Sequence, residues 1–356
     1  MARVLVSMSG GVDSAVAAAT LVQQGHDVAG VTLRLVDLSA EGLDVSRCCA
    51  PEDIAMARAV AEKLGIVHHV LDMENVFRRE VLEPFVSSYL AGETPSPCVR
   101  CNSRVKFGAL LAAARELGAE TLATGHYARV ECAGACFVLR RPRDTGKDQT
   151  YFLFELTQDQ LARVIFPLGD LTKREVRARA RALDLPNSGR PDSQEVCFVP
   201  PGRSYADVLL KLAPDRLPGP GEIVTRDGRV LGRHQGHHLF TVGQRRGLGV
   251  AGRRPLFVLE TRARENQVVV GELEQAYRRQ LLLRDVNWIV PVDEAFEAEV
   301  QIRSRHQPAR ATVTLGGNGS AEVEFAEAML SPAPGQAAVC YDGDRLLGGG
   351  WIVRAR

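Results

Sequence analysis

The residues best suited to chemistry form the segment Ser9-Gly10-Gly11-Val12-Asp13-Ser14, near the N-terminus. It follows an apolar stretch typical of a buried strand, Arg3 to Ser7, and it opens an alanine-rich stretch typical of a helix. Glycines let backbone amides approach a ligand, serines supply hydroxyl donors, and the positive end of a helix dipole attracts anions. Asp13 would repel a bare phosphate, so its expected partner is a Mg²⁺ ion that bridges pyrophosphate oxygens. The segment therefore predicts a polyphosphate site, and it lacks the Gly-Lys-Ser ending of a Walker loop.

This segment resembles the PP-loop of ATP pyrophosphatases, which cleave ATP between the α- and β-phosphates to adenylate an oxygen of their substrate. The resemblance implies that ATP and Mg²⁺ bind at Ser7, Met8, Ser9, Gly10, Gly11, Val12, Asp13 and Ser14. Gly125, in Ala123-Thr124-Gly125-His126-Tyr127, follows a later predicted strand, so it is expected to line the same crevice of a parallel sheet. Leu33, at the end of the second predicted strand, is expected on the adenine side.

Cysteines form a second constellation. Cys98 and Cys101 lie in the segment Pro95 to Asn102, and Cys197 lies much later, in an apolar Val-Cys-Phe context that is equally typical of a buried structural cysteine. Cys101 is predicted near the start of a helix, where the helix dipole and neighbouring arginines would lower its pKa and favour the thiolate. Eight cysteines in a chain without a secretory signal favour thiol or metal chemistry over a disulfide framework.

A series of segments makes the chain similar to the tRNA-specific 2-thiouridylases over essentially its whole length. In order, they are the PP-loop, Cys101-Asn102, Gly125-His126-Tyr127, Lys147 to Phe152, Gln194 to Phe198, and Gly243 to Gly247. The resemblance implies ATP-dependent 2-thiolation of the wobble uridine of tRNA through an adenylated intermediate. It also implies that Cys197 receives a persulfide from a sulfur-donor protein, such as a cysteine desulfurase or sulfur relay. Cys101 would then complete the release of sulfide through a disulfide with Cys197.

The same resemblance implies contacts with tRNA. The residues to which it points are Ser96, Pro97, Cys98, His126, Lys147, Asp148, Gln149, Arg303, Ser304 and Gln336. Ser304 stands where relatives commonly carry an aromatic residue, and Cys98 stands where well-known members carry an aspartate proposed as a general base. Cys98, Cys101 and Cys197 together supply enough thiolates for a 4Fe–4S cluster with one iron left open for an extra sulfide. The cluster and the persulfide relay are therefore alternatives.

Hydrophobic patterning predicts an α/β fold, in which a Rossmann-like PP-loop domain with a parallel sheet precedes two small β-rich domains, the last a β-barrel. The predicted domains are residues 1–201 for ATP binding and catalysis, 202–275 for a central β-rich module, and 276–356 for a tRNA-contacting barrel. Strands are predicted in the first domain at Arg3 to Ser7, Val28 to Leu33, Val67 to Leu71 and Thr121 to Thr124. Helices are predicted from Pro51 to Gly65, from Val105 to Leu117 and from Lys173 to Leu183, and a hairpin around Gly134.

Composition restricts the function without naming it. The net charge of +1 means that an RNA-binding surface must be a local concentration of Arg and Lys, such as Arg245-Arg246. The N-terminus does not read as a signal peptide and no apolar run is long enough to cross a membrane, so a cytoplasmic location without a membrane partner is expected. Two rival functions remain. One is a PP-loop amidating or tRNA-modifying ligase that uses no sulfur, and the other is an RNA-binding protein with a nucleotide sensor and a structural metal.

Overall fold

The computed structural model describes residues 3–36, 51–192, 196–200, 202–250, 252 and 254–356. The chain forms two compact units. Unit 1 comprises Met1–Val81, Pro97–Arg203 and Asp344–Leu346, and unit 2 comprises Leu82–Ser96, Ser204–Gly343 and Leu347–Arg356. Cys48, Cys49 and the Gln194-Glu195 part of a predicted motif lie outside the described residues.

Unit 1 is built on a parallel sheet in the order β3-β2-β1-β4-β7. Its strands are β1 (Arg3–Ser7), β2 (Asp27–Arg34), β3 (Val67–Asp72), β4 (Ala119–Thr124) and β7 (Val164–Ile165). The central strand β1 pairs on both sides, so that Val6 lies between Gly30 and Ala123. Because both faces of such a sheet are covered, the interior residues of β1 and β2 are buried, whereas the edge strand β3 is partly exposed.

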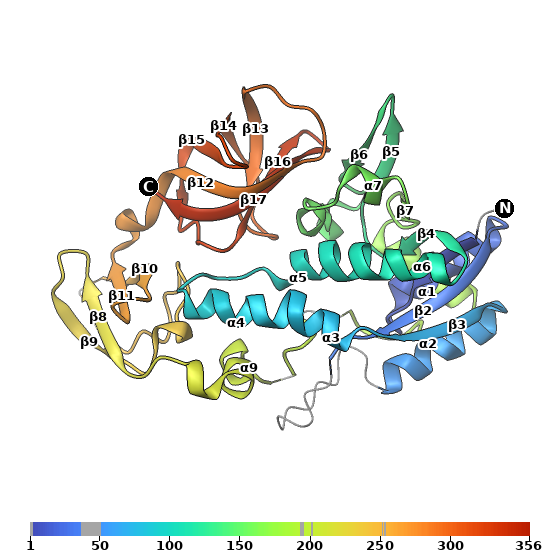
Figure 1. Ribbon diagram of the computed structural model, residues 1–356, viewed down its shortest axis with the longest axis horizontal. Coiled ribbons are helices and arrows are strands. Elements are labelled where there is room, and N and C mark those ends of the chain that lie inside the picture. The colour runs from blue at the N-terminus through green and yellow to red at the C-terminus, as the bar shows by residue number, and fades with distance from the viewer. Residues whose placement is uncertain (1–2, 37–50, 193–195, 201, 251, 253) are drawn as a thin grey trace. The chain divides into compact units, whose positions relative to one another are not determined.

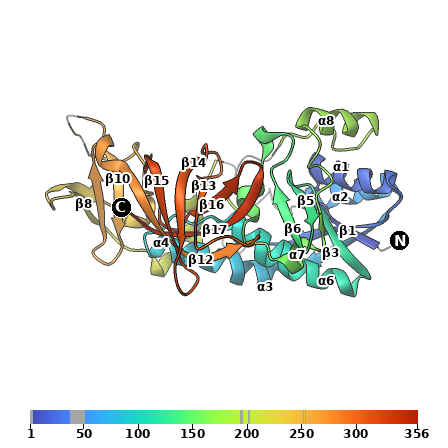
Figure 2. The ribbon, with the colours of Figure 1, turned by 90° about the horizontal axis from the view of Figure 1, so that it is seen from above.

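Helices cover this sheet on both sides, as Figure 2 shows for α8, α1 and α2 on one side and α6 on the other. Their bounds are α1 (Val12–Gln23), α2 (Pro51–Leu64), α6 (Leu111–Glu116) and α8 (Lys173–Ala182). Val6, Val16, Val60 and Val176 share one buried core, which packs α1, α2 and α8 together against β1. This packing holds the start of α8 beside the start of α1.

The predicted helix at Val105 to Leu117 exists but is not a regular α-helix. Helix α5 (Pro97–Arg100) continues directly into a π-helix, η2 (Cys101–Leu110), which leads into α6. The side-chain amide of Gln160 donates hydrogen bonds to the carbonyl oxygens of Ser103, at 3.2 Å, and Phe107, at 2.7 Å, so a distant residue stabilises the wider turns. Local propensity cannot predict this, and π-helical turns often mark functional sites.

The remaining elements of unit 1 are short. They are α3 (Glu74–Phe77), β5 (Arg129–Ala133), β6 (Cys136–Arg140), η3 (Thr145–Lys147), η4 (Thr150–Leu153) and α7 (Gln158–Leu161). A short π-helix, η1 (Arg78–Leu82), follows α3. Strands β5 and β6 form the hairpin predicted around Gly134, where Ala133 pairs with Cys136.

Unit 2 contains a four-stranded sheet in the order β10-β11-β8-β9. Its strands are β8 (Gly221–Thr225), β9 (Val230–His234), β10 (Phe257–Arg262) and β11 (Gln267–Gly271). Ile223, Phe240 and Val258 are among its core residues. The helical elements of unit 2 are α4 (Glu83–Leu90), α9 (Tyr205–Leu212), η5 (Pro214–Arg216), η6 (His237–Leu239) and η7 (Leu273–Ala276). Tyr89 of α4 stacks on Tyr205 of α9 with ring centroids 4.5 Å apart.

The last strands of unit 2 close into a barrel, visible in Figure 1 as the ring from β12 to β17. They are β12 (Tyr277–Trp288), β13 (Ala295–Gln301), β14 (Ala309–Leu315), β15 (Ala321–Leu330), β16 (Ala337–Asp342) and β17 (Arg345–Ala355). The order is β12-β15-β14-β13-β16-β17, and pairing of β12 with β17 completes the ring. The predicted fold class, a parallel-sheet α/β domain followed by two β-rich parts with a terminal barrel, is confirmed. Within the described residues, no helix is both long and apolar enough to cross a membrane.

Candidate active site

The PP-loop joins β1 to α1 and is held by contacts of its own. Gly10 has φ +72°, a left-handed conformation that favours glycine. The Ser14 hydroxyl donates to the Gly11 carbonyl oxygen at 3.0 Å and accepts from the Ser9 amide at 3.2 Å, which closes the loop. From outside the loop, the Asn187 side-chain amide donates to the Gly10 carbonyl oxygen at 2.9 Å. The loop is therefore preformed at the N-terminus of α1, where an anion is favoured.

Gly125 lies directly against this loop, as the sequence led us to expect. A Cβ atom at this position would stand 2.8 Å from both the Asp13 carbonyl carbon and the Ser14 amide nitrogen. Real Cβ atoms do not approach backbone so closely, so only glycine lets the end of β4 pack on the first turn of α1. Met8 and Leu33 are buried, at 2% and 6% exposure.

Asp13 carries contacts that the sequence did not predict. The Lys173 ammonium donates to both carboxylate oxygens of Asp13, at 2.7 and 2.8 Å, and the Tyr127 hydroxyl donates to one of them at 2.9 Å. Lys173 is the first residue of α8 and follows Thr172, whose side chain forms a capping box with Glu175. The capping box could have marked the start of this helix in the sequence. The partner of its first residue, Lys173, depends instead on how α8 packs against α1.

Asp192 is a second residue of the site that sequence analysis did not identify, and three cationic side chains form ion pairs with its carboxylate. Its carboxylate accepts from Lys173 at 2.8 Å, from Lys147 at 2.8 Å and from Arg177 at 2.6 Å. Burial alone would raise the pKa of Asp192, but the hydrogen bonds and charges of Lys147 and Lys173 outweigh burial and lower this pKa to about 2. Asp192 therefore remains a carboxylate at any physiological pH.

The predicted tRNA-contacting residues Lys147, Asp148 and Gln149 lie in unit 1 and are each tied to protein groups. Asp148 forms an ion pair with Arg141 and accepts a hydrogen bond from the Thr150 hydroxyl at 2.7 Å. The Gln149 side-chain oxygen accepts from the Tyr127 amide at 2.9 Å. These contacts give the segment a defined conformation beside Asp192 and Tyr127, and its contact with tRNA stays a prediction.

The three predicted catalytic cysteines all lie in unit 1, and their thiols influence one another. Burial, followed by the neighbouring Cys197, raises the pKa of Cys98 to about 11, against the lowering effect of Lys106. Burial likewise raises the pKa of Cys101 to about 12, while Lys106 lowers it and the other two thiols raise it. The expectation of a lowered pKa at Cys101 is wrong, because its side chain is buried and burial favours the neutral thiol, although Cys101 lies only four residues after Pro97, where the continuous helix begins.

The arrangement of these thiols does not support a metal cluster. Across the described part of the chain, which includes Cys98, Cys101 and Cys197, no group of three or more His, Cys, Asp or Glu side chains is placed to hold a metal ion. Burial favours neutral thiols at Cys98 and Cys101. Iron ligation and sulfur exchange both require thiolates, so these pKa shifts do not distinguish the two routes. Cys340, in contrast, is fully buried in the barrel.

His126 is buried, at 9% exposure, and its Nδ1 lies 2.7 Å from the Thr124 hydroxyl. Burial, and to a lesser degree the charge of Lys106, holds the pKa of His126 well below its ordinary value. The imidazole is therefore neutral near pH 7, and it packs against the rings of Phe107 and Phe166, which also contact each other. A tRNA contact through this residue remains a prediction.

Acidification is expected to destabilise the protein, because burial also lowers the pKa of His68, His234 and His238. A histidine whose pKa is lower in the folded state binds fewer protons there than in the unfolded chain, so its stabilising effect is present at high pH and lost as pH falls. Thermal melts should therefore show the unfolding midpoint falling between about pH 7.5 and about pH 5.5, by roughly 2–4 °C per kcal/mol lost. A midpoint that stays constant or rises on acidification would contradict this account.

The other predicted tRNA-contacting residues, apart from Pro97 and Cys98 in α5, lie in unit 2. Gln336 donates from its side-chain amide to the carbonyl oxygens of Thr94 and Pro95, at 2.9 and 3.1 Å, and so holds the backbone just before Ser96. Arg303 donates to the Ser331 carbonyl oxygen, and the Gln301 side chain donates to the Ser304 carbonyl oxygen at 3.0 Å. Ser304 is half-buried.

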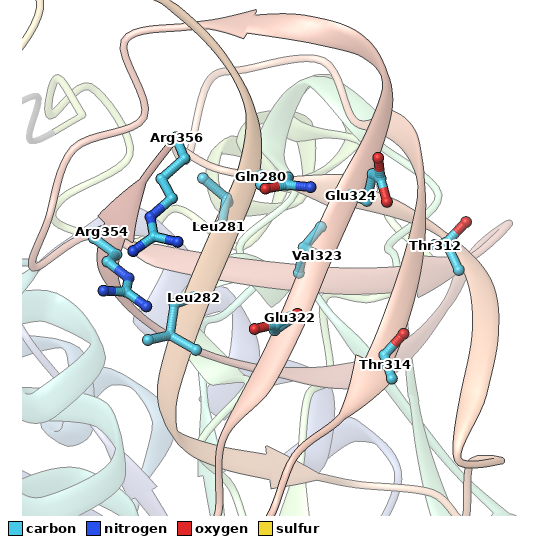
Figure 3. Close-up of a pocket in the computed structure, with 10 residues that line it drawn as sticks. All are labelled: Gln280, Leu281, Leu282, Thr312, Thr314, Glu322, Val323, Glu324, Arg354 and Arg356. Atoms are coloured by element: carbon cyan, nitrogen blue, oxygen red, sulfur yellow. The ribbon is translucent and has the colours of Figure 1, made fainter.

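A separate depression of about 100 Å³ lies on the barrel of unit 2 (Figure 3). Glu322 and Glu324 of β15, Arg354 of β17 and the adjacent Arg356 line it together with polar and apolar residues of β12 and β14. No residue predicted from the sequence to be catalytic lines this depression. Its mixed charges do not select one ligand class.

Comparison with known proteins identifies the family. A family model described as "tRNA methyl transferase HUP domain" matches residues 2–201, one described as "tRNA methyl transferase PRC-barrel domain" matches 207–272, and one described as "Aminomethyltransferase beta-barrel domain" matches 278–352. The chain is 51% identical to the tRNA-specific 2-thiouridylase MnmA of Rhodospirillum centenum, covering 99% of this chain and 92% of that protein. The chain belongs to the tRNA-specific 2-thiouridylase family.

Further relatives carry the same name. The chain is 50% identical to the MnmA of Parvibaculum lavamentivorans, covering 99% of this chain and 91% of that protein. It is 49% identical to the MnmA of Geobacter metallireducens, covering 99% of this chain and 97% of that protein. Membership of this family, expected from the order of the sequence segments, is thus confirmed over 99% of this chain.

Proposed function

We propose that this protein is an ATP-dependent tRNA-uridine 2-sulfurtransferase that acts on the wobble uridine in the anticodon arm of tRNA. The observation that carries the proposal is the presence in one unit of a preformed PP-loop and of Cys101 and Cys197, whose thiols lie close enough to affect each other's ionisation. Family membership supplies tRNA as the substrate, and the PP-loop supports the use of ATP and Mg²⁺. Because its substrate is tRNA, we expect the enzyme in the cytoplasm.

In the proposed first step, the uridine O2 attacks the α-phosphorus of ATP and the bond to the bridging oxygen of pyrophosphate breaks. The base must leave its stack for this oxygen to be reached. Ser9, Gly11 and Ser14 would contact the phosphates, and Asp13 would hold the Mg²⁺ ion that neutralises them. The adenylated oxygen is then a good leaving group at the ring carbon C2.

In the second step, the terminal sulfur of a Cys197 persulfide attacks C2 and AMP leaves. The Cys101 thiolate then attacks the Cys197 sulfur, so that a Cys101–Cys197 disulfide forms and the thiocarbonyl is released. The sulfane sulfur is reduced by two electrons, and the two thiols are oxidised by two electrons. An external thiol must reduce the disulfide before the next turnover. The persulfide comes from a sulfur-donor protein, such as a cysteine desulfurase or sulfur relay.

A 4Fe–4S cluster on Cys98, Cys101 and Cys197 is the alternative route for sulfur. We favour the relay because, among the described residues, these three thiols do not form a group placed to hold a metal ion. A PP-loop ligase that uses no sulfur, or a non-enzymatic RNA-binding protein, would leave the neighbouring thiols of Cys101 and Cys197 without a role.

The test is formation of 2-thiouridine in unmodified tRNA supplied with ATP, Mg²⁺ and a cysteine desulfurase with cysteine. Asp13→Asn should lower the rate by about 100-fold or more, because the neutral amide binds neither Mg²⁺ nor Lys173 well. Asp184→Asn is the matched control, since the Asp184 side chain is 93% exposed and forms a surface ion pair with Lys63. Wild-type protein that makes no 2-thiouridine under these conditions, or that releases AMP without thiolation, would refute the proposed function.

A further inference from the structure

Asp192 connects two parts of the site that bind different substrates in the proposed function. One of its oxygens accepts from Lys147 at 2.8 Å, and the other accepts from Lys173 at 2.8 Å. Lys173 also donates to both oxygens of Asp13, in the first turn after the PP-loop. The result is a continuous chain of ion pairs, Asp13–Lys173–Asp192–Lys147.

A second path joins the same two ends. Gln149 follows Lys147 closely in sequence and exchanges backbone and side-chain hydrogen bonds with Tyr127, at 3.2 and 2.9 Å. The Tyr127 hydroxyl donates to Asp13 at 2.9 Å. The segment predicted to meet tRNA is therefore linked to the phosphate-site carboxylate through two independent sets of contacts within unit 1.

The charges of this network allow its carboxylates and an external polyanion to compete for the same cations. Lys147, Lys173 and Arg177 converge on Asp192, and Asp13 adds one more carboxylate, so the cations exceed the carboxylates by one. Side-chain exposure falls along the chain, from 38% for Lys147 to 21% for Asp192 and 12% for Lys173. Lys147 is thus the member that an external polyanion reaches most easily, whereas Lys173 is the least exposed of the three and contacts both Asp192 and Asp13.

We propose that Asp192 is a positioning residue that couples the binding of tRNA to the binding of MgATP. An RNA phosphate that draws Lys147 away leaves Asp192 with one cation fewer, so Asp192 binds Lys173 more strongly. Lys173 then releases Asp13, whose carboxylate becomes available to Mg²⁺. The coupling is positive, and by linkage MgATP strengthens tRNA binding by the same factor. This inference rests on the proposed function, because it requires both substrates.

A purely structural role for Asp192 makes a different prediction. The network also fastens α8 to α1, and removing one partner of a partly buried ion pair lowers stability. If holding these helices together were its only role, Asp192→Asn would lower the unfolding midpoint and weaken the binding of both substrates. The presence of tRNA would still change nucleotide affinity by the same factor as in the wild type.

The experiment measures by calorimetry the affinity of the intact protein for Mg²⁺ and α,β-methylene-ATP, with and without saturating unmodified tRNA. We expect tRNA to tighten nucleotide binding about 5-fold or more in the wild type and less than about 2-fold in Asp192→Asn. Asp184→Asn should retain the wild-type ratio. The reciprocal measurement, tRNA affinity with and without nucleotide, should give the same factor in the wild type, and it needs no variant.

A second variant provides an independent test in case Asp192→Asn does not fold. Lys147→Gln breaks the chain of ion pairs at its outer end and leaves Asp192 bonded to Lys173 and Arg177. In this variant too, tRNA should no longer tighten nucleotide binding, and the affinity for tRNA should itself be lower. An unchanged ratio in Asp192→Asn, or a wild-type ratio of one in both directions, would overturn the inference. Wild-type protein that binds no nucleotide or no tRNA would instead overturn the proposed function.

Discussion

Replacement of Cys197 by serine is expected to lower formation of 2-thiouridine by about 1000-fold or more, while pyrophosphate release in the first turnover continues. Serine cannot carry a persulfide, so the sulfur step fails, but the PP-loop and Asp13 are untouched. Quenched-flow measurement of pyrophosphate and mass spectrometry of the tRNA nucleosides would follow the two steps separately. Cys132→Ser is the matched control, because Cys132 is exposed on the β5–β6 hairpin.

The Cys98→Ser variant distinguishes the relay from the cluster. In the relay, Cys98 neither receives nor releases sulfur, so activity should stay within about 10-fold of the wild type. In the cluster, loss of one ligand should remove activity together with bound iron and a broad absorption near ~400 nm in protein purified without oxygen. Full thiolation by Cys197→Ser would refute both sulfur routes, because each of them requires the Cys197 thiol.

Replacement of Gly125 by alanine is expected to weaken MgATP binding by roughly 10–100-fold. The added Cβ would lie 2.8 Å from the backbone of Asp13 and Ser14, so either β4 or the first turn of α1 must shift. That turn presents the PP-loop amides, and a small displacement misaligns them with the phosphates.

Calorimetric titration with MgATP tests this prediction, and circular dichroism establishes that the variant is folded. Gly317→Ala is the matched control, because a Cβ at Gly317 meets nothing within 4 Å. An affinity in Gly125→Ala within about 3-fold of the wild type would show that the close approach of β4 to α1 is not needed for nucleotide binding.

Local sequence was sufficient to predict the strand, turn and helix that carry the candidate phosphate site, and most of the elements around them. A strand, a glycine-rich turn and a helix are adjacent in the chain, so Ser9 to Ser14 determine their own backbone environment, and the structure places them as predicted. The strands β1 to β4 were readable for the same reason, since burial imposes a regular pattern on consecutive residues. The cysteines were noticed from spacing and family resemblance, but their roles remain to be tested.

Contacts between distant segments decided the rest. Lys173 and Asp192 carry no motif that marks them, and only the packing of α8 on α1 brings them to Asp13. The π-helix at Cys101 depends on hydrogen bonds from Gln160, and its burial reverses the pKa shift that a helix start would have produced. Periodicity reports which face of an element is buried, whereas the partner of a polar side chain depends on how elements far apart in the sequence pack. The sequence alone therefore located the chemistry, and the tertiary structure determined which charges surround it.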